Sequence, residues 1–397
     1  MDSKILRLKM PGLEDIIMTL LIIAALSIYD IEYLFLGSQL LALGLTVILF
    51  LQQRLMMDRK TGTYFIWMVL FCLICFFSST WARPANTTSI SCAISTVQVC
   101  LITFSIVVYS STERRVYWIL KSFVFACIIL SIRFIVTVPV SNWGNQQRFS
   151  NDSFFGSNTI AMTLAYGAAI LLMIMLKKLK ENKHVIRGPY FAGIIIFMFI
   201  SMMLGTKKGI LIFAIIVGVI VICNSKNPLQ LFGRTIFVLL LACAGYYAIM
   251  NVDVLYNAIG YRVEAMVLGI SGGKADNSTA MRMVFISAAW KEFLKHPILG
   301  IGLDGFRYIN PYEFTYSHNN YVELLSELGV VGCFLYYSIW IKLTKNSIQI
   351  GKIGVNVLTL VSTVFITDIA SVAYSNELTY IILGICLVMD RMNEGGY

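Results

Sequence analysis

The fold is decided by residues 297–332, which read PILGIGLDGFRYINPYEFTYSHNNYVELLSELGVVG. Glycines punctuate the first part, and a helical pattern that can enter a membrane begins near Ser317, the expected N-cap. One face of this helix is polar over about 12 Å, at about 1.5 Å per residue. Its residues are Asn319, Asn320, Glu323, Ser326 and Glu327. Because a carboxylate deep in a bilayer costs roughly 3 kcal/mol, we expect this face to line a water-filled or protein-lined cavity at a functional site.

The composition is that of a membrane protein. Of the 397 residues, 58% are hydrophobic and 13% are charged, whereas soluble domains are about 45–50% apolar. Repeated apolar runs of about 17–22 residues can cross about 30 Å of hydrocarbon as helices and are too long for barrel strands. The sequence therefore predicts an all-α polytopic membrane protein. Its first apolar run is expected to stay as an anchor, since no cleavage site follows it.

About twelve transmembrane helices fit these runs. They are expected at residues 13–29, 33–51, 63–80, 92–110, 118–138, 158–176, 190–204, 209–223, 235–251, 319–341, 353–371 and 377–389. With both termini in the cytoplasm, most lysines and arginines fall on the inner side, as the positive-inside rule requires. The formal charge of +10 therefore indicates topology first, and it does not imply nucleic acid as a partner.

The whole chain, residues 1–397, is expected to form one integral membrane domain with two substantial outer loops, 139–157 and 252–318. The larger loop contains an amphipathic helical pattern from Met281 to Lys295, and long loops of this kind are usually functional or disordered. Nine cysteines lie almost wholly in apolar runs, where they are expected to act as small hydrophobic residues. No residue spacing on the outer side is typical of a metal site, so neither a metal nor a cofactor is expected.

Two motifs in this part of the chain carry a resemblance to a known family. They are Pro297-x-x-Gly300-x-Gly302 and His318-Asn319-Asn320-Tyr321-x-x-Leu324-Leu325-x-Glu327-x-Gly329-x-x-Gly332. With Arg282, Trp290 and Phe306, they resemble the hallmark of the O-antigen ligase and polysaccharide polymerase superfamily over residues 282–332. Within it, the chain is most similar to polymerases of capsule or exopolysaccharide repeat units. The resemblance implies a GT-C-like glycosyltransferase whose active site, partly built by loop 252–318, lies on the outer face of the cytoplasmic (inner) membrane.

His318 is the expected general base. It lies at the outer end of its helix, where the positive potential of the helix N-terminus disfavours imidazolium and so leaves an imidazole that can accept a proton. The alternative is a histidine that only anchors the helix at the interface. Glu323, about one turn deeper, is expected to orient the acceptor sugar rather than to act directly, and Asn319, Asn320 and Glu327 to line the acceptor pocket. Gly329 and Gly332 are expected to allow close helix packing.

Exterior cations are the expected ligands of a substrate diphosphate. Arg282 is the first candidate, because a guanidinium can hold two phosphate oxygens at once. The resemblance places further phosphate-binding groups at Arg148 and at Lys207 and Lys208, although lysine departs from the Ser-Arg-Gly-like turn of relatives. Arg262 and Arg307 are weaker candidates. Each of these side chains has an alternative reading as an interfacial anchor or a solvated charge, and Arg133 is expected either to snorkel or to line the cavity.

The resemblance implies polymerisation of polyprenyl-diphosphate-linked oligosaccharide repeat units into surface polysaccharide, such as O-antigen, capsule or exopolysaccharide. The transfer is expected to invert the anomeric carbon and to need no metal. The alternative is an O-antigen ligase, which transfers the lipid-linked glycan to lipid A-core or another terminal acceptor. Expected partners are membrane lipid and, in the same pathway, a flippase and a chain-length regulator. A flippase or transporter is the rival from another class, but such proteins typically show internal repeats, and no repeated halves are seen here.

Overall fold

The computed structural model describes residues 11–27, 32–55, 57–82, 86–139, 143, 157–181, 186–225, 227–270, 277–351 and 354–393. In this part of the chain every regular element is a helix, which confirms the predicted all-α class. The helices are α1 (Leu13–Ser27), α2 (Glu32–Leu51), α3 (Arg59–Ser78), α4 (Asn86–Tyr109), α5 (Glu113–Thr137), α6 (Ser157–Lys180), α7 (Arg187–Met203), α8 (Lys207–Asn224), α9 (Pro228–Asn251), α10 (Asp253–Leu255), a π-helical turn η2 (Tyr256–Gly260), α11 (Tyr261–Ile270), α12 (Asn277–Lys295), α13 (Phe306–Ile309), α14 (Asn320–Ile350), α15 (Val355–Thr367) and α16 (Glu377–Asn393).

Each of the twelve segments predicted to span the membrane overlaps one of these helices. Among the described residues, six helices are long and apolar enough to cross a membrane, namely α3, α4, α5, α6, α9 and α14. The apolar parts of α2, α7 and α15 are shorter. The chain is therefore a multi-pass membrane protein, while the number of twelve spans stays a prediction.

Local capping explains where several helices begin. The side chain of Asp58 accepts a hydrogen bond from the amide of Thr61 and so caps α3. Thr112 caps α5 in the same way, and Asn227, followed by Pro228 in the first turn, caps α9. Each cap satisfies a backbone N–H group that would otherwise lack a partner at the helix start.

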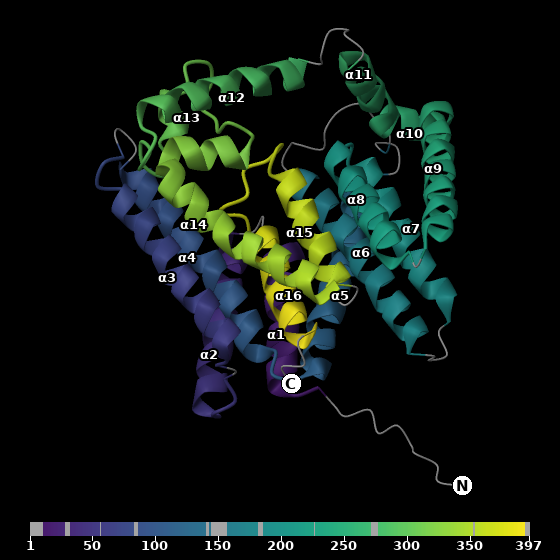
Figure 1. The fold of residues 1–397 in the computed structure, drawn as a ribbon, viewed down its shortest axis with the longest axis horizontal. Helices are drawn as coiled ribbons and strands as arrows, with labels where there is room; N and C mark the ends of the chain where they lie inside the picture. Colours follow the sequence, from purple (N-terminus) through teal and green to yellow (C-terminus); the bar gives the residue numbers. More distant parts are fainter. Residues whose placement is uncertain are drawn as a thin grey trace.

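The helices pack as a bundle around α16, which is buried from Leu378 to Arg391. Single polar bonds cross the core between helices: Thr103 of α4 donates to the carbonyl oxygen of Tyr380 at 2.6 Å, and Trp67 of α3 to that of Leu335 at 2.7 Å. By contrast, α9 has no buried residue and stands at the edge of the bundle (Figure 1). Its apolar side chains are therefore placed to meet lipid, which needs no protein partner.

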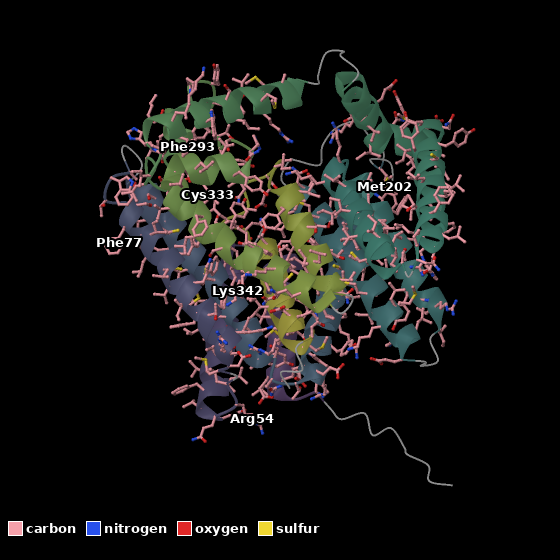
Figure 2. All side chains as sticks on the ribbon, viewed as in Figure 1. Arg54, Phe77, Met202, Phe293, Cys333 and Lys342 are labelled. Atoms are coloured by element: carbon pink, nitrogen blue, oxygen red, sulfur yellow. The ribbon has the colours of Figure 1, made fainter. Side chains whose placement is uncertain are left out.

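The two ends of the bundle differ. α1 begins and α16 ends at one end, whereas α12, α13 and the start of α14 cover the other (Figure 1). Figure 2 accordingly places Arg54 and Phe293 at opposite ends. Loop 252–318, predicted as a large outer loop, thus contains several short helices and α12, and the predicted amphipathic helix 281–295 lies inside α12.

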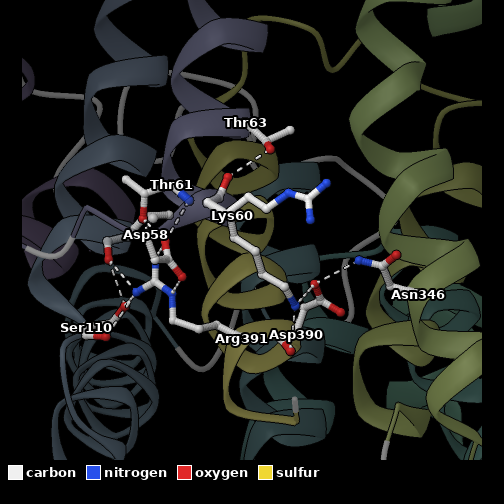
Figure 3. A network of polar contacts seen from close by, with 10 residues as sticks. Asp58, Lys60, Thr61, Thr63, Ser110, Asn346, Asp390 and Arg391 are labelled. Atoms are coloured by element: carbon white, nitrogen blue, oxygen red, sulfur yellow. Dashed lines mark hydrogen bonds and ion pairs between the residues drawn. The ribbon is translucent and has the colours of Figure 1, made fainter. Parts of the chain in front are cut away.

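Two partly buried ion pairs hold the helices together at the end of the bundle opposite to α12 (Figure 3). Arg391 of α16, only 2% exposed, binds Asp58 with its Nε at 2.9 Å and the carbonyl oxygen of Ser110 with its Nη1 at 3.2 Å. Beside it, Lys60 of α3 binds Asp390 at 2.6 Å. These bonds tie the last helix to α3 and to the end of α4.

α14 is broken at Gly329, which has φ 63° and ψ −167°. The groups freed by the break pair with loop 297–302: the amide of Val330 donates to Pro297 O at 2.9 Å, and that of Ile301 to Ser326 O at 3.0 Å. A Cβ atom at Gly329 would lie 2.1 Å from Ile298 O. Close packing was predicted at Gly329, and the structure shows it against loop 297–302 rather than against another helix. Gly329 allows the chain to turn, and loop 297–302 provides hydrogen-bond partners for the backbone groups that the break leaves unpaired in the helix.

Candidate functional site

His318 lies two residues before the first residue of α14, at the end of the bundle that α12 covers. Its ring stacks on Phe285 of α12, with centroids 6.1 Å apart, and meets Tyr316 edge-on at 4.4 Å. Its backbone is left-handed, with φ 62°. This conformation costs a non-glycine residue about 1–2 kcal/mol and is tolerated where the surrounding structure holds it.

The N-cap of α14 is Asn319, and the prediction of Ser317 was wrong. The Asn319 side chain accepts from the amide of Val322 at 3.1 Å. Ser317 instead donates its hydroxyl to Asn319 O at 3.0 Å, which closes a tight turn around His318. The left-handed residue between them shifts the helix start by two positions, an effect that helical periodicity does not show.

Glu323 holds this turn in place through a hydrogen bond to its backbone. It is 2% exposed, and its Oε2 accepts a 2.7 Å hydrogen bond from the amide of Ser317. The carboxylate thus holds the backbone beside His318. Its predicted contact with an acceptor sugar stays a prediction.

Asn320 is fully buried and uses its whole amide on protein groups. Its Nδ2 donates to Asp368 Oδ2 at 3.0 Å and to the Tyr337 hydroxyl at 2.9 Å, and its Oδ1 accepts from the amides of Ala373 and Tyr374 at 2.8 and 3.1 Å. Asn320 therefore fastens α14 to the segment between α15 and α16.

Glu327 is equally committed. It is 1% exposed, and it accepts from the amide of Phe306 at 3.3 Å and from the hydroxyl of Tyr374 at 3.1 Å. The polar face of α14 is thus lined by protein, one of the two environments expected for it. Asn320 and Glu327 thus hold the helix against neighbouring segments, and their predicted place in an acceptor pocket stays a prediction.

Asp368 was missed from the sequence. It is fully buried at the end of α15, and its Oδ1 has no hydrogen-bond partner among the described residues. The charge of Lys208 interacts with it. A carboxylate that ends an apolar run was the available signal, but only its contact with Asn320 connects it to this site.

Arg282 lies on α12 and Lys208 on α8. Arg282 lies on α12 three residues before Phe285, hence on the same face of that helix as the ring that contacts His318. It is partly exposed. Lys208, with Lys207, begins α8, which packs on α15, and its charge acts on Asp368 at the end of α15. Arg282 therefore lies on a helix that packs on α14, and Lys208 on one that packs on α15, while their binding of a substrate diphosphate stays a prediction.

Arg262 is placed at the turn between α7 and α8, near the two lysines. Its guanidinium donates to the carbonyl oxygen of Gly205 and lies over the ring of Tyr261, 5.2 Å from the centroid. Arg148 lies outside the described residues. Arg133 is half-buried.

Arg307 is paired with an acid. Its Nη2 lies 2.6 Å from Asp304 Oδ1. Burial raises the pKa of Asp304, and the charge of Arg307 only partly opposes this effect. The pair reduces the positive charge that Arg307 can offer to a substrate.

These contacts define what the site can do. An imidazole lies at a helix N-terminus, and a guanidinium lies one helical turn along α12 from its stacking partner. The ammonium group of Lys208 acts through its charge on Asp368. The arrangement suits proton acceptance from a hydroxyl next to a bound anion.

A comparison with known families matches a part of the chain that contains this site. Residues 191–337 match the family model described as O-antigen ligase. The match runs from α7 into α14 and includes all the predicted site residues except Arg148. No curated protein and no solved structure matches the chain.

Proposed function

Because its matched segment shows that the chain belongs to the O-antigen ligase and polysaccharide polymerase superfamily, we propose that it is a glycosyltransferase for lipid-linked glycans. The reaction joins polyprenyl-diphosphate-linked oligosaccharide repeat units into surface polysaccharide on the outer face of the inner membrane. The site residues are those around the start of α14.

One observation supports this assignment most directly. His318 stacks on Phe285, and Arg282 lies one turn away on the same face of α12. The base and the anion-binding group are thus held by two helices that pack on each other, α12 and α14. A base for the acceptor and a cation for the leaving diphosphate are the two groups that this transfer requires.

The proposed step is an in-line displacement. An acceptor hydroxyl oxygen attacks the anomeric carbon of the donor, and the bond from that carbon to the diphosphate oxygen breaks with its electron pair. The hydroxyl proton goes to His318, and polyprenyl diphosphate leaves. The configuration at the anomeric carbon inverts because attack and departure occur on opposite faces.

Positive side chains stabilise the negative charge that grows on the diphosphate. Arg282 can bind two of its oxygens at once, and Lys208 and Lys207 add point charges from the α8 side. Arg262 keeps the turn before α8 in place through its bond to Gly205. In this proposal the side chains take the role that a divalent cation has in other transferases.

An O-antigen ligase is the second candidate, since the matched family model carries that description. Both reactions share the same chemistry and differ in the acceptor. A deletion strain separates them: a polymerase defect leaves single repeat units on the cell surface, whereas a ligase defect leaves finished polymer on its carrier lipid.

The direct test uses the purified full-length protein with lipid-linked repeat units and no nucleotide sugar. We expect elongation, and we expect His318→Ala to reduce kcat by about 100-fold or more, the usual contribution of a general base. Arg282→Ala should also abolish elongation. Matched controls are His296→Ala and Arg59→Ala, two exposed residues outside the proposed site.

Two results would overturn the proposal. One is near-normal elongation by His318→Ala or Arg282→Ala in protein that is inserted and abundant. The other is movement of the lipid-linked glycan across a vesicle membrane without elongation, which would indicate a flippase.

A further inference from the structure

A groove of about 580 Å³ lies between α12 and residues 306–312, which comprise α13 and the segment after it. We call it the α12 groove. We infer that it is a saccharide subsite, which holds sugar residues of the glycan next to the reacting unit. This inference rests on the proposed function and adds to it the place where the carbohydrate is bound.

The two walls of the α12 groove have the chemistry that sugar rings require. One wall belongs to α12 and offers Ser287 and Lys291, whose side chains can bond sugar hydroxyl groups. The other is apolar and includes Pro311 and Tyr312, the latter 58% exposed. A sugar ring has an apolar C–H face and polar edges, so it can lie on the aromatic ring while its hydroxyls reach α12.

The size of the groove agrees with a short oligosaccharide. Ligand sites commonly have volumes of about 300–1,000 Å³. The polar wall disfavours the polyprenyl tail, whose burial there would leave charged groups without water.

Phe285 connects the α12 groove to the proposed base. Its ring lies 6.5 Å from that of Tyr312 and 6.1 Å from that of His318. A glycan whose reacting sugar is beside His318 would therefore continue past Phe285 into the groove.

Lys291 is the cation that the groove offers to a ligand. Glu292 is occupied by Lys295 at 2.8 Å and lies 3.6 Å from His296. In the part of the chain that the structure describes, Lys291 has no acidic partner. Its ammonium group can donate to a hydroxyl or a carboxylate oxygen of a sugar.

The test compares substitutions that alter the groove with substitutions of the same kind at exposed residues outside it. Ser287→Trp places a bulky ring in the groove, and Tyr312→Ala removes the aromatic wall. Leu294→Trp is the control on the same helix, because Leu294 is 61% exposed and does not line the groove, and Tyr247→Ala is the control for loss of an exposed tyrosine. The probes are lipid-linked repeat units and the free oligosaccharide released from them.

We expect Ser287→Trp and Tyr312→Ala each to raise KM by about tenfold, equivalent to about 1.4 kcal/mol, with kcat changed less than twofold. Saturation-transfer NMR should show that the free oligosaccharide binds the wild type and Leu294→Trp but not Ser287→Trp. Transfer onto the free oligosaccharide identifies the bound sugars as those of the acceptor. Inhibition without transfer identifies them as those of the donor.

The outcomes separate this inference from the proposed function. Normal KM and normal oligosaccharide binding in both groove variants would overturn the subsite and leave the glycosyltransferase intact. If the wild type does not elongate, the proposed function fails, but loss of oligosaccharide binding in Ser287→Trp would still support the subsite.

Discussion

The backbone amide of Gly302 donates a 2.8 Å hydrogen bond to the carbonyl oxygen of Glu327. This carbonyl is available because α14 is broken at Gly329, two residues further on. The loop before the site and the helix that carries it are thus one interlocked unit. A substitution in the loop or in the helix should therefore displace His318 even when the substituted residue does not contact it.

Gly329→Ala should destabilise the protein and reduce elongation. Its Cβ would lie 2.1 Å from Ile298 O, and its φ of 63° costs alanine about 1–2 kcal/mol in addition to the clash. Thermal unfolding in detergent measures the first effect and the elongation assay the second. The control is Gly218→Ala in the middle of α8, where no atom lies within 4 Å and alanine should stabilise by about 0.5–1 kcal/mol. Equal stability of the two variants would contradict the interlocked unit.

His318→Gly should be more stable than His318→Ala by about 1–2 kcal/mol, because glycine adopts the left-handed φ of 62° without steric cost. Both variants lose the ring contacts with Phe285 and Tyr316, so these cancel in the comparison. Melting temperatures of the two proteins check the difference. Both should lack elongation activity. If alanine is at least as stable as glycine, the backbone at this position is not left-handed in solution.

Asn320→Asp should cost on the order of 2–3 kcal/mol, the penalty for leaving buried polar groups unpaired. The change replaces the Nδ2 donor by an oxygen that faces Asp368 Oδ2 at 3.0 Å and the Tyr337 hydroxyl at 2.9 Å. The control is Asn227→Asp, an exposed N-cap at which aspartate caps equally well. A melting temperature unchanged by Asn320→Asp would show that this network does not support the start of α14.

Asp58→Asn should destabilise the protein at neutral pH and much less in acid. Burial alone would raise the pKa of Asp58, but hydrogen bonds from Thr61 and the charge of Arg391 outweigh it and lower the pKa below its ordinary 3.8. A depressed pKa means that the ion pair contributes fully above pH 3.8 and is lost as pH falls through the folded-state value. Asparagine still caps α3, so the variant isolates the ion pair.

The measurement is the melting temperature of both proteins from pH 7 to pH 3. Loss of one partner of a buried pair costs about 3–5 kcal/mol, and the lower end applies because the Asp58 side chain is 26% exposed. Glu313→Gln, at an exposed site, should change stability by less than about 0.5 kcal/mol. Because the pair lies at the end of the bundle away from His318, kcat at neutral pH should be unchanged. A difference from the wild type that is constant with pH would argue against the ion pair.

The sequence by itself determined that the chain is a helical membrane protein and where its apolar helices lie. Hydrocarbon thickness sets a minimum length for a spanning helix, so the apolar runs can be recognised without knowing their neighbours. The motif from His318 to Gly332 indicated the superfamily in the same local way, and α12 was visible from its amphipathic pattern. Each of these signals is carried by residues that lie close together in the sequence.

Only the tertiary structure decided which polar groups meet. Asn320 bonds Asp368, and Arg391 bonds Asp58, across long separations in the sequence. The break at Gly329 is likewise visible only with loop 297–302 beside it, because helical periodicity continues through that glycine. The physical reason is that hydrophobic pattern reports which side of a helix is buried, whereas the partner of a buried polar group is set by how distant segments pack.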